Sequence, residues 1–165
     1  MIKPGRFSLQ ALQLNNKFCE KNGDATVWYE DLSSFADLGP ECGTCLLAVG
    51  WLERGRPFAT GTVDAAVYSR LVALFQHPWE PAVAMGFHRC DLCLYDGPPG
   101  KRNIYIPTSG EVFVAPELVI HYMNAHGYRP PDVFCAAVLA CPEMRSMPYL
   151  KALLAVARPL VQVAG

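Results

Sequence analysis

This sequence of 165 residues is poor in charge and has neither a long basic run nor a long apolar run. Charged residues make up 18% and apolar residues 52%. This composition excludes a disordered chain, because disorder requires low hydrophobicity and high charge. With a net charge of −1 and no basic stretch, the sequence carries no specific nucleic-acid signal. A chain of this length has room for one hydrophobic core, so we expect one folded domain.

Nothing in the sequence resembles a membrane-spanning segment, which needs about 20 apolar residues. The longest apolar run near the end, residues 150–163, is interrupted by Lys151, Arg158 and Pro159. The first residues also lack the apolar stretch of a signal peptide. We therefore expect a cytoplasmic protein that does not bind a membrane.

Motifs of several enzyme classes are absent from the sequence. Zinc-dependent nucleobase deaminases are excluded because there is no H-x-E motif, and zincin proteases because there is no H-E-x-x-H. The glycine-rich phosphate-binding motifs and the G-x-S-x-G motif of hydrolases are missing as well. The catalytic residues, if there are any, stay unknown at this point.

The sequence does contain seven cysteines and four histidines, among them two closely spaced pairs. Cys90 and Cys93 form a C-x2-C pair, and His121 and His126 form an H-x4-H pair that begins after 27 intervening residues. A tight turn brings the two thiolates of C-x2-C to one ion, and two histidines at the end of a helix can reach the same ion. We predict a Cys2His2 site for zinc, which suits mixed thiolate and imidazole ligands. The alternative is two unrelated pairs, of buried cysteines and hydrogen-bonded histidines.

His88 is a fifth candidate, because it lies only two residues before Cys90. It could orient one of the ligands from outside the coordination shell. It could also replace one of the two later histidines as a ligand. The third possibility is an ordinary solvent-facing or hydrogen-bonded side chain.

A second C-x2-C pair, Cys42 and Cys45, has no cysteine or histidine close to it in the sequence. It also lacks the strand before it and the helix after it that mark a thioredoxin-like redox site. We expect this pair to be accidental or weakly structural, with a half-site shared between subunits as the alternative. Cys135 and Cys141 lie in an apolar stretch, where we expect them to be buried.

The apolar pattern predicts an α+β fold, a small mixed domain with short antiparallel strands and about four helices around the zinc site. A loosely attached N-terminal segment, residues 1–25, would precede a single domain, residues 26–165. We expect strands at 26–29 and 46–52 and a hairpin of 103–107 with 111–115. We expect helices at 65–76, 116–126, 132–140 and 148–157.

Two residues should set the ends of these helices. Asp64 is the predicted N-cap of the first helix, and Gly127 the left-handed residue that ends the second. The two prolines at 130 and 131 should then turn the chain so that the third helix packs on the second. In that arrangement Phe134, Val138 and Leu139 lie against Leu118, Val119 and Tyr122.

Several short segments form a recognisable pattern: W-Y-E-D-L-S at 28–33, V-G-W-L-E-R-G at 49–55, G-F-H at 86–88 with the cysteines that follow, A-P at 115–116, H-Y at 121–122, His126, and Y-R-P-P at 128–131 with Phe134. With these segments the run from Trp28 to Leu150 resembles an uncharacterised bacterial family, one of the domains of unknown function. The resemblance implies the metal site and implies no activity. Cys42, Cys45, the first 25 residues and the C-terminal tail lie outside it.

Three functions are compatible with these features. The favoured one is a zinc-stabilised protein-interaction module (a regulator, an immunity protein or an assembly protein) without catalytic activity, because four protein ligands leave no open coordination position. It implies a protein partner. The alternative is a small zinc-dependent enzyme, hydrolytic or lyase in type, with three ligands and a water, in which His88 or Glu117 moves protons. The third is a nucleic-acid binder that uses the basic residues near the site, Arg89, Lys101, Arg102 and Arg129. The oligomeric state is not predicted.

Overall fold

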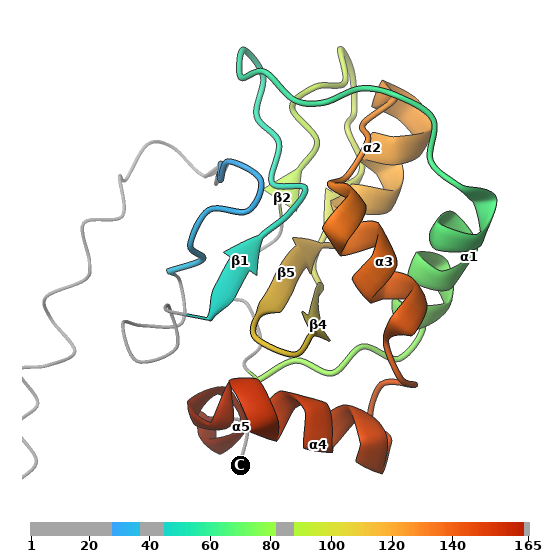
Figure 1. Cartoon of the computed structure of the whole chain (residues 1–165). Helices are drawn as coiled ribbons and strands as arrows, with labels where there is room; N and C mark the ends of the chain where they lie inside the picture. Colours follow the sequence, from blue (N-terminus) through green and yellow to red (C-terminus); the bar gives the residue numbers. More distant parts are fainter. Residues whose placement is uncertain (1–27, 37–44, 82–87, 164–165) are drawn as a thin grey trace, which may run out of the picture.

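The computed structural model describes residues 28–36, 45–81 and 88–163. Within these residues the fold is α+β, with five helices and two small sheets (Figure 1). This confirms the predicted fold class, while the fifth helix and one parallel strand pair were not predicted. The expected N-terminal segment, residues 1–25, and Cys42 lie outside the described residues.

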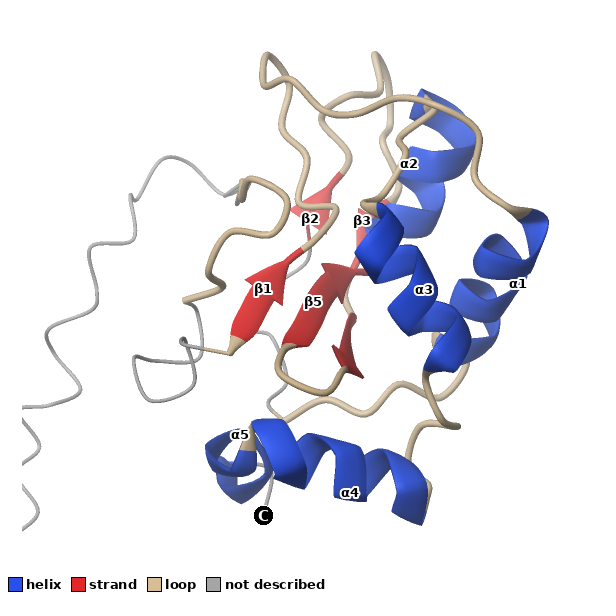
Figure 2. Ribbon diagram, viewed as in Figure 1, coloured by secondary structure: helices blue, strands red, loops and turns tan. Residues whose placement is uncertain are grey.

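The larger sheet has three strands in the order β1-β5-β4, shown in red in Figure 2. Strands β4 (Asn103–Pro107) and β5 (Val112–Pro116) form the predicted antiparallel hairpin, with Ile104 opposite Ala115. Strand β1 (Leu46–Ala48) pairs with β5 in parallel. Because β5 lies in the centre of the sheet, all five of its residues are buried. The hairpin therefore lies at the centre of the hydrophobic core.

The described residues form five helices: α1 (Ala65–Leu74), α2 (Leu118–His126), α3 (Asp132–Ala140), α4 (Met147–Val156) and α5 (Arg158–Val163). In Figure 1, α1, α2 and α3 lie beside the sheet, and α4 and α5 lie below it. Helix α3 packs against α1 and β4. Helix α4 is fastened to β4 because the Tyr149 hydroxyl donates a hydrogen bond of 2.6 Å to the carbonyl oxygen of Tyr105.

The two predicted helix caps are confirmed. The Asp64 carboxylate accepts a hydrogen bond of 2.7 Å from the backbone N–H of Ala66 at the start of α1. Gly127 ends α2 in the left-handed conformation, with φ of 63°. The N–H of Tyr128 then donates to the carbonyl oxygen of Tyr122 at 3.1 Å. This bond satisfies one of the carbonyl groups that the end of a helix leaves without an intrahelical partner.

Some local predictions were wrong. Of the strand predicted at 26–29, residues 26 and 27 lie outside the described residues, and Trp28 and Tyr29 are in a loop and not in a strand. The pairing of this segment with β1 is instead an isolated bridge between Ser34 and Leu47. Leu139 is 52% exposed and not packed on α2. The reason is the direction of α3, which turns Phe134 toward the sheet, where its ring meets that of Phe113 with centroids 5.8 Å apart.

Candidate metal centre

The cysteine pair lies on a tight turn between two short strands. Strands β2 (His88–Arg89) and β3 (Pro99–Gly100) pair antiparallel, and the N–H of Cys90 continues the pairing with a 3.1 Å bond to the Pro98 carbonyl oxygen. Gly97 packs so closely on this turn that a Cβ there would overlap the Cys90 carbonyl oxygen. The turn therefore fits only with glycine at position 97, and it directs Cys90 and Cys93 to the same side.

The histidine pair comes from α2, whose position is set by the core. The helix follows directly on β5, the central strand, and buries Leu118, Val119 and Tyr122. His121 and His126 are both half-buried, and His126 is the last residue of the helix. The core thus fixes the face of α2 on which the two imidazoles meet the cysteine turn.

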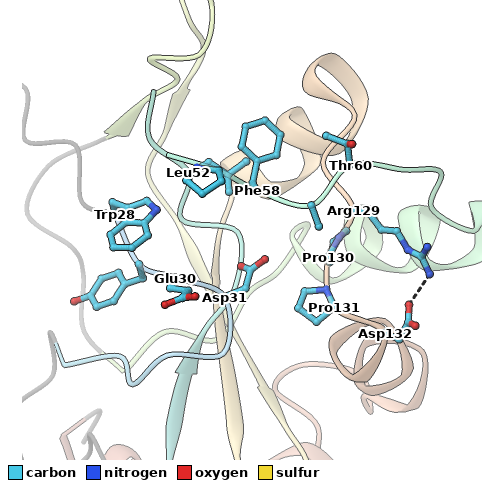
Figure 3. A pocket seen from close by; sticks show the side chains of 13 residues that line it. Trp28, Glu30, Asp31, Leu52, Phe58, Thr60, Arg129, Pro130, Pro131 and Asp132 are labelled. Atoms are coloured by element: carbon cyan, nitrogen blue, oxygen red, sulfur yellow. Dashed lines mark hydrogen bonds and ion pairs between the residues drawn. The ribbon is translucent and has the colours of Figure 1, made fainter. Parts of the chain in front are cut away.

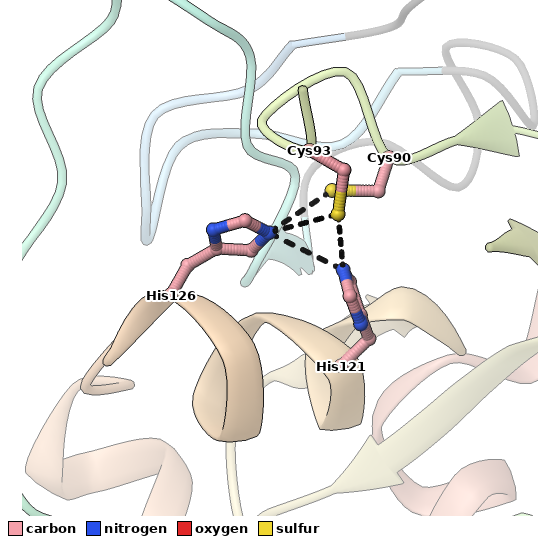
Figure 4. Close-up of side chains that lie close together, drawn as sticks. All are labelled: Cys90, Cys93, His121 and His126. Atoms are coloured by element: carbon pink, nitrogen blue, oxygen red, sulfur yellow. Dashed lines mark hydrogen bonds between the residues drawn. The ribbon is translucent and has the colours of Figure 1, made fainter. Parts of the chain in front are cut away.

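The four predicted side chains converge on one point, as Figure 4 shows. Their Sγ and ring nitrogen atoms all lie within 4.8 Å of one another. Cys90 Sγ is 3.3 Å from His126 Nε2, and Cys93 Sγ is 3.3 Å from His121 Nε2. The two Nε2 atoms are 3.2 Å apart. Such an arrangement could hold one metal ion.

Hydrogen bonds alone do not account for this cluster. The Nε2 atom of His126 lies within 3.5 Å of three polar atoms, on Cys90, Cys93 and His121. An imidazole nitrogen offers either one proton or one lone pair, so it can satisfy only one of these three neighbours by a hydrogen bond. A positive ion at the centre would satisfy all four atoms at once.

The protonation of these groups is set by their surroundings. Burial raises the pKa of the Cys90 thiol, and the backbone N–H groups of Cys93 and Leu92, which donate to its sulfur, act in the opposite direction. Burial, together with the neighbouring His126, lowers the pKa of His121. A lowered pKa keeps the imidazole of His121 neutral near pH 7, and a neutral imidazole has the lone pair that a metal ligand needs.

Arg54 holds the cysteine turn from outside, a role that the sequence analysis missed. Its backbone N–H donates to Asp91 Oδ2 at 3.0 Å. Its guanidinium donates to the carbonyl oxygens of Asp91 at 2.6 Å and of Cys93 at 2.8 Å. The only sequence signal was the position of Arg54 in the segment 49–55, one of those that carry the family resemblance. Three hydrogen bonds from one residue therefore fix the turn between the two cysteines.

The other candidates for chemistry lie outside the cluster. His88 is not among the four grouped side chains, and its ring lies edge-on to that of Trp51, with centroids 5.5 Å apart. Glu117 forms an ion pair of 2.6 Å with Arg102. Partial burial raises the pKa of Glu117, but the hydrogen bonds from Arg102 and from the Lys101 backbone outweigh it, and the pKa is lowered overall.

The remaining predicted residues also lie apart from the cluster. Cys45 is half-buried next to β1, and Cys42, the other cysteine of that C-x2-C pair, lies outside the described residues. Cys141 is buried, as predicted, and burial raises its pKa to about 12. Cys135 is only partly buried.

Of the four basic residues considered for nucleic acid, Arg102 is paired with Glu117 and Arg129 with Asp132.

Residues 27–139 match the model of a family described as Domain of unknown function (DUF7919), and the chain belongs to this family. The match covers the cysteine turn, α2 and all of β4 and β5. No curated protein and no solved structure matches the chain. Among the described helices, none combines the length and the apolar character needed to cross a bilayer.

Proposed function

We propose that this member of the DUF7919 family is a protein-interaction module that a zinc ion stabilises and that has no catalytic activity of its own. The observation that carries the proposal is the convergence of two sulfur and two nitrogen atoms within 4.8 Å of one another. Four protein ligands fill the tetrahedral coordination of zinc, and filled sites of this kind are structural.

The spacing of the four atoms supports zinc as the ion. Zn–S bonds of about 2.3 Å and Zn–N bonds of about 2.0–2.1 Å at tetrahedral angles place sulfur and nitrogen about 3.5 Å apart and two nitrogens about 3.3 Å apart. The corresponding distances here are 3.3–3.5 Å and 3.2 Å. Four of the six distances among these atoms thus agree with a zinc tetrahedron, which supports zinc as the ion.

An ion in this position would join two parts of the fold. One is the turn between β2 and β3, a sheet of two short strands. The other is α2, which belongs to the main core through Leu118, Val119 and Tyr122. Strands of two residues bury too little surface to be stable alone. We expect the metal to supply the stability that this small sheet lacks.

Two apolar side chains directly after the site support a protein partner. Leu94 is 82% exposed and Tyr95 is 87% exposed, and both follow the ligand Cys93 on the same turn. Large exposed apolar side chains are a feature of interaction surfaces, and tyrosine is frequent among residues that dominate binding. The metal would hold these two side chains in a fixed position, which lowers the entropy lost on binding.

The contacts of the proposed proton carriers favour this function over an enzyme. Glu117 is engaged with Arg102, and its lowered pKa makes it a poor proton donor near pH 7. The ring of His88 packs on Trp51. A hydrolytic or lyase-type enzyme would need three protein ligands with a water as the fourth, and a group beside that water to move protons.

Zinc-edge X-ray absorption of the purified full chain tests whether four protein side chains complete the coordination of the ion. We expect a first shell of two sulfur and two nitrogen atoms. Because nitrogen and oxygen scatter alike in the first shell, the histidines are counted from the outer-shell scattering of their imidazole rings. A shell with only one sulfur, or with the signature of only one imidazole, would contradict the proposal and favour the enzyme. Loss of the zinc signal in Cys93→Ser, with retention in Cys135→Ser, would assign the ion to this cluster.

Affinity purification from the source cells with quantitative mass spectrometry tests the interaction surface. The double variant Leu94→Ser/Tyr95→Ser should lose the bound protein while keeping its zinc and melting temperature. Leu139→Ser/Met147→Ser is the matched control, because these side chains are 52% and 63% exposed on other elements. Equal recovery of the same partner with all three proteins would contradict the proposed surface.

A further inference from the structure

The described residues also form a cavity of about 550 Å³ whose lining contains none of the four clustered side chains, and the proposed function does not use it. Three segments far apart in the sequence form it: residues 28–31, 52 with 57–60, and 129–132. Two of its walls are joined by backbone hydrogen bonds, from the Arg129 N–H to the Ala59 carbonyl oxygen at 2.9 Å and from the Gly61 N–H to Gly127 at 3.0 Å. The volume is in the range of small-ligand sites.

The lining combines rings with carboxylates. Figure 3 shows Asp31 in the middle of the cavity wall, with Trp28 and Glu30 on one side, Pro130 on the other and Phe58 above. The rings of aromatic side chains carry a negative electrostatic potential on their faces, which attracts cations. Rings and carboxylates together therefore favour a positively charged ligand.

The charges around the cavity do not cancel. Arg129 is in an ion pair with Asp132 at 2.8 Å, and Arg56 is paired with Glu53 at 3.4 Å. In the described part of the chain, neither Glu30 nor Asp31 forms an ion pair with a basic side chain. Two adjacent carboxylates thus face the cavity region without a cation of their own. A bound cation would provide the missing charge.

Asp31 is held in one orientation by two donors. The backbone N–H of Gly50 donates to Oδ1 at 2.9 Å, and the Tyr128 hydroxyl lies 2.9 and 2.8 Å from the two carboxylate oxygens. A carboxylate has about four acceptor positions, so these two donors leave others for a ligand. Burial, together with the charge of Glu30, raises the pKa of Asp31 against the effect of these bonds. A bound cation would favour the ionised carboxylate and so lower the pKa of Asp31.

We propose that this cavity binds an alkylammonium group, that of a small amine or of a lysine side chain, between its aromatic and proline surfaces and the Asp31 carboxylate. The wall already binds a cation within the chain. The Arg56 guanidinium lies over the Trp28 ring, 4.4 Å from the centroid. That face of Trp28 is therefore already covered, and the ring surfaces left for the ligand are those of Tyr29 and Phe58 together with Pro130 and Pro131.

Titration of the zinc-loaded full chain tests this proposal, followed through the indole N–H signal of Trp28 in NMR spectra. The probes are cadaverine, a five-carbon chain with an ammonium group at each end, and the peptide acetyl-Gly-Lys-Gly-amide. The uncharged control is 1-pentanol. We expect both ammonium probes to shift the Trp28 signal and pentanol to leave it in place. Tighter binding of cadaverine assigns a free amine, and tighter binding of the peptide assigns a lysine side chain.

Two variants, each with one negative charge removed, test whether the Asp31 carboxylate binds the ligand. Asp31→Asn keeps the shape and an acceptor for Gly50, and it should weaken cadaverine binding by about tenfold or more, through loss of a desolvated charge. Glu111→Gln removes one charge from the exposed turn between β4 and β5 and should bind as the wild type does. Equal affinity of the two variants, equal binding of pentanol, or no shift with either ammonium probe would overturn the proposal.

Discussion

Arg54 Nη2 donates a hydrogen bond of 2.8 Å to the carbonyl oxygen of Cys93, a residue 39 positions further along the chain. The same guanidinium holds the carbonyl oxygen of Asp91 through Nε. The two bonds hold the backbone of the turn from which two of the four proposed ligands project. Residues that orient metal ligands in this way often matter nearly as much as the ligands.

Arg54→Lys should lower the affinity for zinc by about tenfold, because lysine cannot donate to two carbonyl groups with a rigid planar fork. Competition with a chromophoric chelator measures this affinity. Arg56→Lys is the matched control on the same loop, since Arg56 contacts Glu53 and Trp28 and not the cysteine turn. Equal zinc affinities of the two variants would show that Arg54 does not position the site.

Cys93→Ser should abolish zinc binding and lower the melting temperature sharply. Structural zinc in small modules contributes on the order of 10 kcal/mol to the folded state, and this contribution would be lost. Metal content by mass spectrometry and thermal unfolding measure the two effects. Cys135→Ser, outside the cluster and only partly buried, should keep the metal. Unchanged zinc in Cys93→Ser would refute the ligand assignment.

Replacing Cys42 and Cys45 together with serine should leave zinc at about one ion per chain, as expected for a single structural site. Cys45 is half-buried beside β1 and is not part of the cluster. Elemental analysis of the purified variant gives the stoichiometry. A fall from two ions to one would reveal a second site that includes this pair.

Gly127→Val should destabilise the fold by about 2 kcal/mol, because a β-branched residue is strained at a φ of 63°. The space around Gly127 is open, so the cost comes from the backbone and not from a clash. Zinc affinity should fall too, since His126, one of the proposed ligands, is adjacent. Chemical unfolding with and without zinc measures both. Gly110→Val, also in open space, is the control, and a wild-type midpoint for Gly127→Val with zinc retained would contradict the prediction.

Asp31→Asn should make the protein more stable than the wild type at neutral pH. Burial raises the pKa of Asp31 in the folded state above its value in the unfolded state. The protonated carboxyl therefore contributes stability at a pH below the unfolded pKa. This contribution is lost as the pH rises through the folded pKa. The difference between variant and wild type should therefore shrink toward the ordinary aspartate pKa of about 4. Urea unfolding of both proteins at several pH values measures this difference in stability. A stability advantage of the variant that is smaller at pH 7 than at pH 5 would contradict the prediction.

The clustering of the two cysteines and two histidines could be predicted from the sequence because their spacing is local. C-x2-C is a turn motif, and His121 and His126 lie on one helix whose end Gly127 marks. The boundaries of α3 were predicted for a similar reason, since Pro131 comes directly before its first residue. Each of these features depends on residues a few positions apart.

The features that were missed depend on residues far apart. The bonds of Arg54 to the cysteine turn and of Tyr128 to Asp31 join positions separated by 37 to 97 residues. No periodicity or propensity encodes such a pair, because only the packed core decides which loops meet. The exposure of Leu139 was missed for the same reason, since the orientation of α3 is set by its contacts with α1 and β4.

The parallel pairing of Leu46 with Val112 sets an order for the folding reaction. Strands β4 and β5 are joined by a short turn and can pair at once, whereas β1 meets β5 only after a long loop has closed, at a cost in chain entropy. We therefore expect the hairpin to form first and β1 to join last. Pulse-labelling hydrogen exchange should show late protection of the Val49 N–H, which bonds to Val114 across this pair, and early protection there would reverse the order. Until β1 arrives, one edge of β5 is open to other chains, which makes this edge the place where slow folding would lead to aggregation.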